Sequence, residues 1–180
     1  MLVVMSLVFE NLDDITRPFM LEELDHDERG PGEIFLSPRL SRSGAARYPA
    51  LLRTALAEGS DVSLEHALRM PGVLKTEESS RTRTGRPIVK RVPVNAATMI
   101  AEGEFNRYYI RGLCARALTE GGGDLVVYRA RASRNPRPAS QAKIGMRLAP
   151  DVLLDDLRQS IGREPSVLPE INSGLSVRLG

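Results

Sequence analysis

The sequence is poor in the residues that support disulfides, metal sites and aromatic cores. Its 180 residues include no tryptophan, one cysteine, two histidines, four phenylalanines and four tyrosines. A single cysteine excludes an intrachain disulfide and fits a reducing compartment. With so few aromatic residues, the core must consist mainly of Leu, Val, Ile, Ala and Met. Cys114 lies among the apolar positions of a predicted helix, so we interpret it as a small core residue and not as a nucleophile or metal ligand.

Long hydrophobic runs are also missing. No apolar stretch in the sequence approaches the roughly 20 residues that span a bilayer. The apolar stretch Met1–Phe9 lacks the basic start and the long apolar segment of a secretory signal peptide, and its Val and Leu content favours a first strand. We therefore expect a cytoplasmic protein without a membrane partner.

The sequence lacks the signatures of common catalytic sites. Gly121–Gly123 precedes a predicted strand, whereas a phosphate-binding glycine loop precedes a helix, and no G-x-S-x-G nucleophile elbow occurs. His26 stands between two aspartates, which a charged, solvent-exposed helix end explains more simply than a metal site. His66 has no Cys or second His at ligand spacing. The sequence therefore favours a protein without enzymatic activity, metal or cofactor.

Charge is distributed unevenly along the chain, although the net charge at pH 7 is only +2. Residues 1–70 contain 7 Lys/Arg and 12 Asp/Glu, a balance of −5; residues 71–148 contain 15 and 6, a balance of +9; residues 149–180 contain 3 and 5, a balance of −2. Either the acidic and basic parts pair, within or between chains, or the basic part binds a polyanion. The excess of Arg over Lys, 22 to 3, suits bidentate contacts to carboxylates or phosphates, although codon usage produces the same bias.

The longest predicted element is a helix from Ala96 to Glu120. Asn95 is a good N-cap residue, and Gly121–Gly123 is a strong stop signal. Apolar residues occupy two sides of this helix and leave only a narrow polar strip. This pattern predicts a helix that packs on two sides, within its own domain or against another chain.

Five residues interrupt the apolar pattern of this helix. Asn106 falls within the apolar stripe, where a buried amide needs hydrogen-bond partners. Gly103 and Gly112 each cost about 1 kcal/mol against Ala in a helix interior, so we interpret both as sites where a neighbour approaches closely. Arg107 and Arg111 are like charges four residues apart, and either a carboxylate or a phosphate would relieve their repulsion.

Further elements are predicted on both sides of the central helix from periodicity, caps and turn residues. Helices are expected from Arg17 to Glu28, from Gly44 to Glu58 with Ser43 as cap, from Asp61, as cap, to Arg69, and from Pro150 to Ser160. Pro49 either splits the second of these helices or marks its true start. Strands are expected at 73–78, 88–94, 124–131, 143–148 and 175–179. We therefore predict an α+β fold, with a helical N-terminal part and a small, mainly antiparallel sheet from 73–94 and 124–148 packed by the long central helix. Charge and Pro/Gly content divide the chain into an acidic, mostly helical subdomain (1–70), a basic α+β core (71–162) and a Pro/Gly-rich tail (163–180).

Basic residues gather in the tip and return strand of a hairpin, on the central helix, on the strand after it and in the following loop. On one shared face they would neutralise several phosphates of a nucleic acid or another polyanion. The absence of a base-reading motif favours backbone- or shape-driven binding. Tyr108, Tyr109 and Tyr128 would be stacking platforms if exposed and core residues if buried. The candidate binding residues are Arg81, Arg83, Arg86, Lys90, Arg91, Arg107, Arg111, Arg129, Arg131, Arg134 and Arg137.

Two other functions are open on sequence grounds. The acidic and basic parts, the apolar start and a final edge strand also suit a self-assembling or interaction subunit, of a phage particle or of a larger bacterial complex. Glu102, Glu104 and Asp124 would supply carboxylates for a metal-dependent nuclease, although the next strand carries Arg129 and Arg131 where a carboxylate and a lysine are needed. We rank polyanion binding first, assembly as a homo-oligomer or hetero-complex second, and catalysis third.

Overall fold

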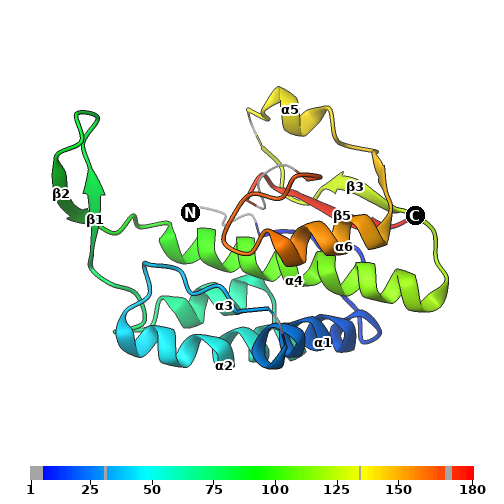
Figure 1. Cartoon of the computed structure of the whole chain (residues 1–180), viewed down its shortest axis with the longest axis horizontal. Coiled ribbons are helices and arrows are strands. Elements are labelled where there is room, and N and C mark those ends of the chain that lie inside the picture. The colour runs from blue at the N-terminus through cyan, green and yellow to red at the C-terminus, as the bar shows by residue number, and fades with distance from the viewer. Residues whose placement is uncertain (1–5, 31, 134, 169–171) are drawn as a thin grey trace.

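Helix α4 (Ala96–Glu120) runs through the middle of the protein, as Figure 1 shows. The computed structural model describes residues 6–30, 32–133, 135–168 and 172–180. Both ends of α4 lie where the sequence predicts them. Gly121 ends the helix in the left-handed conformation (φ 65°), whereas the Asn95 side chain makes no capping hydrogen bond. The expected two-sided packing is confirmed, because 17 of the 25 helix residues are buried.

Three helices form a layer on one side of α4 (Figure 1). They are α1 (Thr16–Arg29), α2 (Arg42–Glu58) and α3 (Asp61–Leu68). Each contributes buried leucines to the core, with Leu24, Leu52 and Leu64 fully inaccessible to solvent. This layer is the helical N-terminal part that the sequence predicts.

The N-terminal caps of these helices differ in part from the prediction. Ile15 is the N-cap residue of α1, and Asp13 Oδ1, two residues earlier, accepts a hydrogen bond from the Thr16 backbone N–H at 2.8 Å. Ser41, and not Ser43, caps α2, which continues through Pro49 without a break. Ser60, and not Asp61, caps α3 through a reciprocal pair of bonds with Ser63. The capping serine lies two residues before the predicted cap in α2 and one residue before it in α3, and in both helices its side chain accepts from the third N–H of the first turn.

The strands form two antiparallel sheets instead of the single predicted sheet. One consists of β1 (Glu77–Arg81) and β2 (Pro87–Arg91), and the other has the order β4-β3-β5, with β3 (Leu125–Arg129), β4 (Arg147–Leu148) and β5 (Leu175–Leu179). Strand β3 is buried at Leu125 and Val127, whereas every residue of β2 is exposed. The hairpin offers no apolar face to the core, so it stays apart. The α+β class is confirmed.

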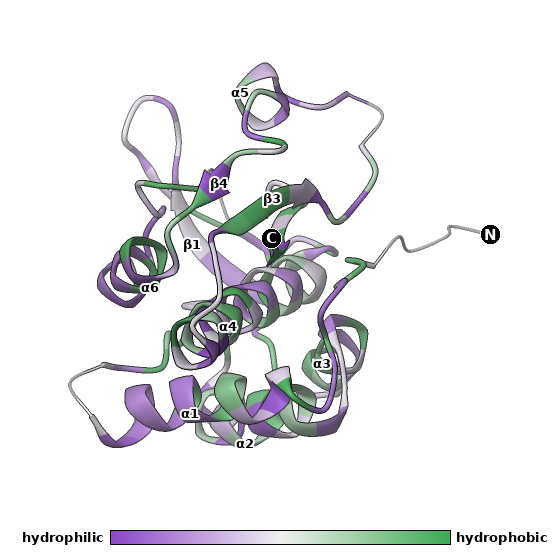
Figure 2. Ribbon diagram, turned by 90° about the vertical axis from the view of Figure 1, so that its right-hand side faces the viewer, coloured by the Kyte–Doolittle hydropathy of each residue, from purple (hydrophilic) through white to green (hydrophobic). Residues whose placement is uncertain are grey.

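The three-stranded sheet and α6 (Pro150–Gln159) cover the other side of α4, and the short helix α5 (Pro138–Gln141) lies beyond the sheet (Figure 1). Figure 2 shows hydrophobic residues on α4 and on the faces of the elements around it. The buried cluster extends from Met20 to Val177. The predicted tail therefore supplies a core strand, β5, at the edge of the sheet.

Both interior glycines of α4 permit close approaches, as expected. A Cβ on Gly112 would lie 2.9 Å from the backbone nitrogen of Met20 in α1, and a Cβ on Gly103 would lie 3.1 Å from Oδ1 of Asn172. The prediction of a first strand is wrong for residues 6–9, which form no strand, although the Val8 N–H donates to the carbonyl oxygen of Ala130. Residues 1–5 lie outside the described ranges. None of the helices in the described part of the chain has both the length and the apolar character needed to cross a bilayer.

Candidate functional sites

The hairpin of β1 and β2, residues 77–91, projects from the body of the protein (Figure 1), and we call it the arm. Its strands pair antiparallel in a continuous register from Glu77 opposite Arg91 to Arg81 opposite Pro87. Gly85 closes the tip with a positive φ of 84°, which a side chain would disfavour. A two-stranded hairpin exposed on both faces is only marginally stable in water, so its base needs an anchor.

A segment before α2 supplies that anchor. Arg39 Nε donates to Glu78 at 2.7 Å, and Lys90 Nζ lies 3.3 Å from the same carboxylate. Lys75, just before the arm, donates from Nζ to the carbonyl oxygen of Pro38 at 2.7 Å. The arm is therefore held at its base while its tip extends into solvent.

The arm presents five basic residues, all of them exposed. Arg81 donates to the Gly85 carbonyl oxygen at 3.2 Å, and Lys90 is paired with Glu78. Within the described ranges, the guanidinium groups of the other three, Arg83, Arg86 and Arg91, have neither a hydrogen bond nor an ion pair. With two glutamates against five basic residues, the arm carries a charge of +3.

Arg111 lies inside the protein and not on a binding surface, contrary to the prediction. Its side chain is fully buried, and its guanidinium donates to Glu23 from Nε at 2.9 Å and to Asp27 from Nη1 at 2.6 Å and Nη2 at 2.9 Å. Burial by itself raises the pKa of Asp27, but the hydrogen bonds and charge of Arg111 outweigh it and hold the pKa below its usual value. The sequence leaves open whether a carboxylate or a phosphate pairs with Arg111, and the structure shows carboxylates.

Arg107 is also buried and does not contribute to a basic surface. Its two terminal nitrogens donate to the carbonyl oxygens of Leu157 and Arg163, at 3.1 and 3.2 Å, and so fasten α4 to α6 and the following loop. Tyr108 and Tyr109 are core residues and not stacking platforms, because both are buried. Arg107 and Arg111 therefore form a polar strip inside the protein. Their partners lie far away in the sequence, so the sequence alone does not reveal this burial.

The remaining predicted binding residues lie near the sheet and α5. Arg129, Arg131 and Arg137 line a small polar cavity of about 170 Å³ together with three serines. Nη1 of Arg131 donates to both carboxylate oxygens of Glu102, and Arg129 donates from Nη2 to Gln141 at 3.2 Å. Arg137 is exposed, and Arg134 lies outside the described residues. The predicted residues therefore form an exposed group on the arm, a separate and partly buried cluster near the sheet, and an interior pair.

The three carboxylates proposed for a nuclease are not brought together. Glu102 pairs with Arg131, while Asp124 follows the far end of α4 and lies 3.6 Å from Arg147. Glu104 lies on α4 before its end at Glu120, about 24 Å of helix away. Among the described residues, no group of three His, Cys, Asp or Glu side chains is arranged to hold a metal ion.

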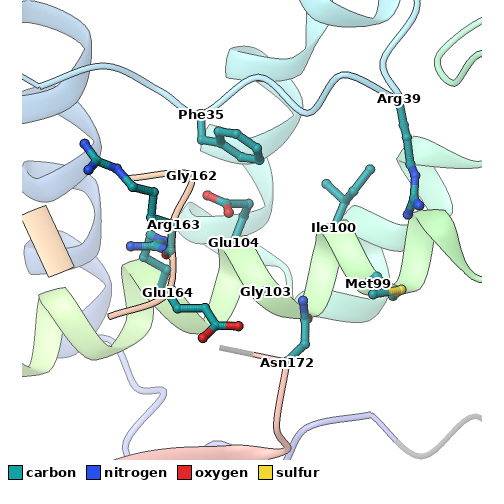
Figure 3. A pocket seen from close by; sticks show the side chains of 11 residues that line it. Phe35, Arg39, Met99, Ile100, Gly103, Glu104, Gly162, Arg163, Glu164 and Asn172 are labelled. Atoms are coloured by element: carbon teal, nitrogen blue, oxygen red, sulfur yellow. The ribbon is translucent and has the colours of Figure 1, made fainter. Parts of the chain in front are cut away.

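A pocket over the N-terminal half of α4 was not predicted from the sequence (Figure 3). It has a volume of about 330 Å³ and is lined by Phe35, Arg39, Met99, Ile100, Gly103, Glu104, Arg107, Gly162, Arg163, Glu164 and Asn172. In Figure 3 the Glu104 side chain points from α4 toward the segment that carries Phe35. The lining comes from four stretches that are distant in sequence. Only Glu104, an acidic residue beside buried positions, could have indicated this pocket from the local sequence.

Several polar groups in and beside this pocket lack partners among the described residues. The half-buried Glu104 carboxylate has neither a hydrogen bond nor an ion pair, and buried Arg107 Nε, Asn172 Oδ1 and the Tyr48 hydroxyl also lack hydrogen-bond partners. Burial raises the pKa of Glu104 to about 7, although the charges of Arg107 and Arg111 pull it down. A carboxyl group that titrates near neutrality inside a pocket is a frequent property of binding and catalytic sites.

Comparisons of the chain with protein-family models, with curated proteins and with solved structures found no match.

Proposed function

We propose that this protein binds nucleic acid, or another polyanion of similar charge density, through the phosphate backbone. The arm carries this proposal: its three unpaired guanidinium groups, Arg83, Arg86 and Arg91, are exposed on a projecting element. Arginine side chains that neutralise phosphates release counterions, which favours binding without any base contact.

The placement of the second basic cluster supports the same reading. Figures 1 and 2 show the arm and the α5 segment on the same side of α4, with α1, α2 and α3 on the opposite side. The side with the three helices contains most of residues 1–70, which carry −5, while the other side contains most of residues 71–148, which carry +9. A polyanion is attracted to one side and repelled by the other, so the charge distribution also orients it.

Assembly is a second candidate because of apolar residues on and beside the arm. Val89 is 67% exposed and Val94 is 89% exposed. Both strands of the arm have a free edge in the described structure. A free edge with apolar side chains is able to pair with another chain, which would stabilise a hairpin that is marginal alone.

Salt-dependent binding distinguishes these two functions. The affinity of purified protein for fluorescently labelled single-stranded RNA, single-stranded DNA and duplex DNA is measured by anisotropy over a series of salt concentrations. Each lost phosphate contact reduces the slope of log K against log salt by about 0.7 to 0.9. The variant Arg83→Gln/Arg86→Gln should therefore lower the slope by about 1.5 if both residues contact phosphates.

Arg42→Gln/Arg47→Gln is the matched control, because it removes two exposed charges from α2 on the opposite side. It should retain both the affinity and the slope. Light scattering during size-exclusion chromatography tests the alternative function, assembly. A large particle that forms without nucleic acid, together with no salt-dependent binding, would favour assembly and overturn the proposal.

A further inference from the structure

The pocket around Glu104 contains unpaired hydrogen-bonding groups of both kinds. Glu104 and Asn172 Oδ1 are acceptors, and Arg107 Nε–H is a donor. Arg107 is only 4% exposed, and its terminal nitrogens are engaged by the carbonyl oxygens that fix its position, so only Nε is left for a ligand. An unpaired buried polar group costs about 1–3 kcal/mol, which a complementary ligand would recover.

The other walls of the pocket suit a flat ring. Phe35 and Ile100 face the space beside Glu104 (Figure 3). Gly162 keeps this wall open, because a Cβ there would lie 2.9 Å from the Phe35 ring. Aromatic side chains stack on the faces of heterocycles, and a volume of about 330 Å³ is at the small end of ligand sites. A single base with its sugar is of suitable size.

The cation at the rim of the pocket favours an anionic group on the ligand. Arg39 is already paired with Glu78, so Arg107 and Arg163 balance the two glutamates of the lining, Glu104 and Glu164. The Arg163 guanidinium is exposed and has no partner among the described residues. An electrically neutral ring that bears a phosphate therefore fits better than a guanidinium or an amine.

We infer that this pocket binds a free nucleotide with a guanine-type base. The Glu104 carboxylate accepts from the ring N–H and the exocyclic amino group, and Arg107 Nε–H donates to the ring carbonyl oxygen. Phe35 stacks on the base, and Arg163 contacts the phosphate. Adenine, cytosine and uracil do not present this pair of adjacent N–H donors beside a carbonyl group, so they bind more weakly. The site is separate from the arm and does not depend on polyanion binding.

Isothermal titration of the full-length protein with GMP, IMP, AMP, CMP and UMP tests this inference at pH 8, where Glu104 is largely ionised. We expect GMP to bind with a Kd on the order of 1 mM or tighter, and at least about tenfold more tightly than AMP. IMP lacks the amino group and should bind several-fold more weakly than GMP. Agmatine is included as a guanidinium compound.

Variants assign the binding to the pocket. Glu104→Gln turns one acceptor into a donor opposite the N–H groups, so GMP affinity should fall at least about tenfold. Glu22→Gln, which changes an exposed carboxylate on α1 outside the pocket lining, is the control and should change the GMP affinity less than about threefold. Thermal unfolding verifies that both variants are folded, and Arg83→Gln/Arg86→Gln should bind GMP like the wild type whether or not its nucleic-acid binding is lost.

Equal affinity for GMP and AMP, tighter binding of agmatine, unchanged GMP affinity in Glu104→Gln, or no binding of any nucleotide at about ten times the expected Kd would each overturn the inference.

Discussion

Arg111 joins helix α4 to helix α1 through carboxylates that lie 84 and 88 residues earlier in the chain. Its guanidinium also lies 5.0 Å from the centre of the Tyr108 ring, and Tyr108 donates its hydroxyl hydrogen to Asp27 at 2.7 Å. Arg158 of α6 shares Glu23, so three helices meet at one buried group of charges. From the sequence, two arginines four residues apart indicate a surface strip, because nothing local identifies partners so distant.

Removing Arg111 should destabilise the protein strongly. In Arg111→Met, buried Asp27 loses its guanidinium partner and, among the described residues, keeps only its contacts with Tyr108 and His26, while the Glu23 carboxylate keeps only Arg158. Breaking one side of a buried ion pair costs about 3–5 kcal/mol. Arg53→Met is the matched control, because Arg53 also pairs with α1 carboxylates, Asp25 and Glu28, but is 36% exposed. An exposed pair contributes about 0–1 kcal/mol. Urea unfolding measures both free energies, and similar losses in the two variants would contradict the buried network.

Glu104 should make the stability of the ligand-free protein depend on pH near neutrality. Its pKa rises from 4.5 in an unfolded chain to about 7 in the folded protein. The folded state therefore holds this proton more tightly, and stability falls as pH rises from about 4.5 to about 7. Asp27, whose pKa is lowered, affects stability only in more acidic solution.

The variant Glu104→Gln lacks this titration. Its Tm should exceed that of the wild type by a larger margin at pH 8 than at pH 5, as differential scanning fluorimetry without nucleotide would show. Glu164→Gln at the exposed rim should follow the wild type at both pH values. A constant difference between Glu104→Gln and the wild type across this range would show that Glu104 does not have a raised pKa.

At the scale of elements, the sequence predicts best those segments whose signals are local. The stop at Gly121 fixes the end of α4, and Pro150 and alternating apolar residues place α6 and β3 within a few residues. The separation of the two sheets was not predictable, because β2 and β3 both combine branched apolar residues with a final Arg and differ in their contacts. The pocket was equally inaccessible, since Phe35 and Asn172 meet Glu104 only after the chain folds.

The two interior glycines of α4 should respond differently to alanine. A Cβ at Gly112 would meet the Met20 backbone at 2.9 and 3.1 Å, which the packed α1 backbone cannot easily relieve. A Cβ at Gly103 would meet only the side chain of Asn172, at 3.1 to 3.5 Å, and that side chain is able to shift by a few tenths of an ångström. Alanine adds about 1 kcal/mol of helix propensity at both sites.

We therefore expect Gly112→Ala to lose about 1–2 kcal/mol overall and Gly103→Ala to be near neutral or more stable. Urea unfolding of the two single variants gives the comparison, because each carries the same change in the same helix. If Gly112→Ala proved as stable as Gly103→Ala, α1 and α4 would not pack as closely as the structure indicates.

At the scale of the whole molecule, the chain folds back so that its last strand completes the layer on α4. Strand β5 pairs with β3 along five residues, from Leu125 opposite Leu179 to Arg129 opposite Leu175. The buried Asn106 amide donates to the Leu175 carbonyl oxygen at 2.9 Å and accepts from the Ser176 hydroxyl at 2.7 Å. The sequence indicates an amide that needs partners, but it does not identify a tail almost 70 residues later as their source.

Truncation after Gly162 should therefore prevent stable folding. It removes Leu168, Leu175 and Val177, all buried, and each such side chain contributes about 1.5–3 kcal/mol. Their sum approaches the 5–15 kcal/mol of a typical domain, and the truncation also removes the hydrogen bonds of the buried Asn106 amide with Leu175 and Ser176. Replacing residues 77–91 with a short Gly/Ser link is the matched control, because the arm is of similar length and lies outside the buried cluster. Thermal unfolding followed by circular dichroism should show no cooperative transition for the truncated protein and a Tm within a few degrees of wild type for the armless one. A cooperative transition in the truncated protein would mean that α4 and the N-terminal helices form a core that is sufficient without β5.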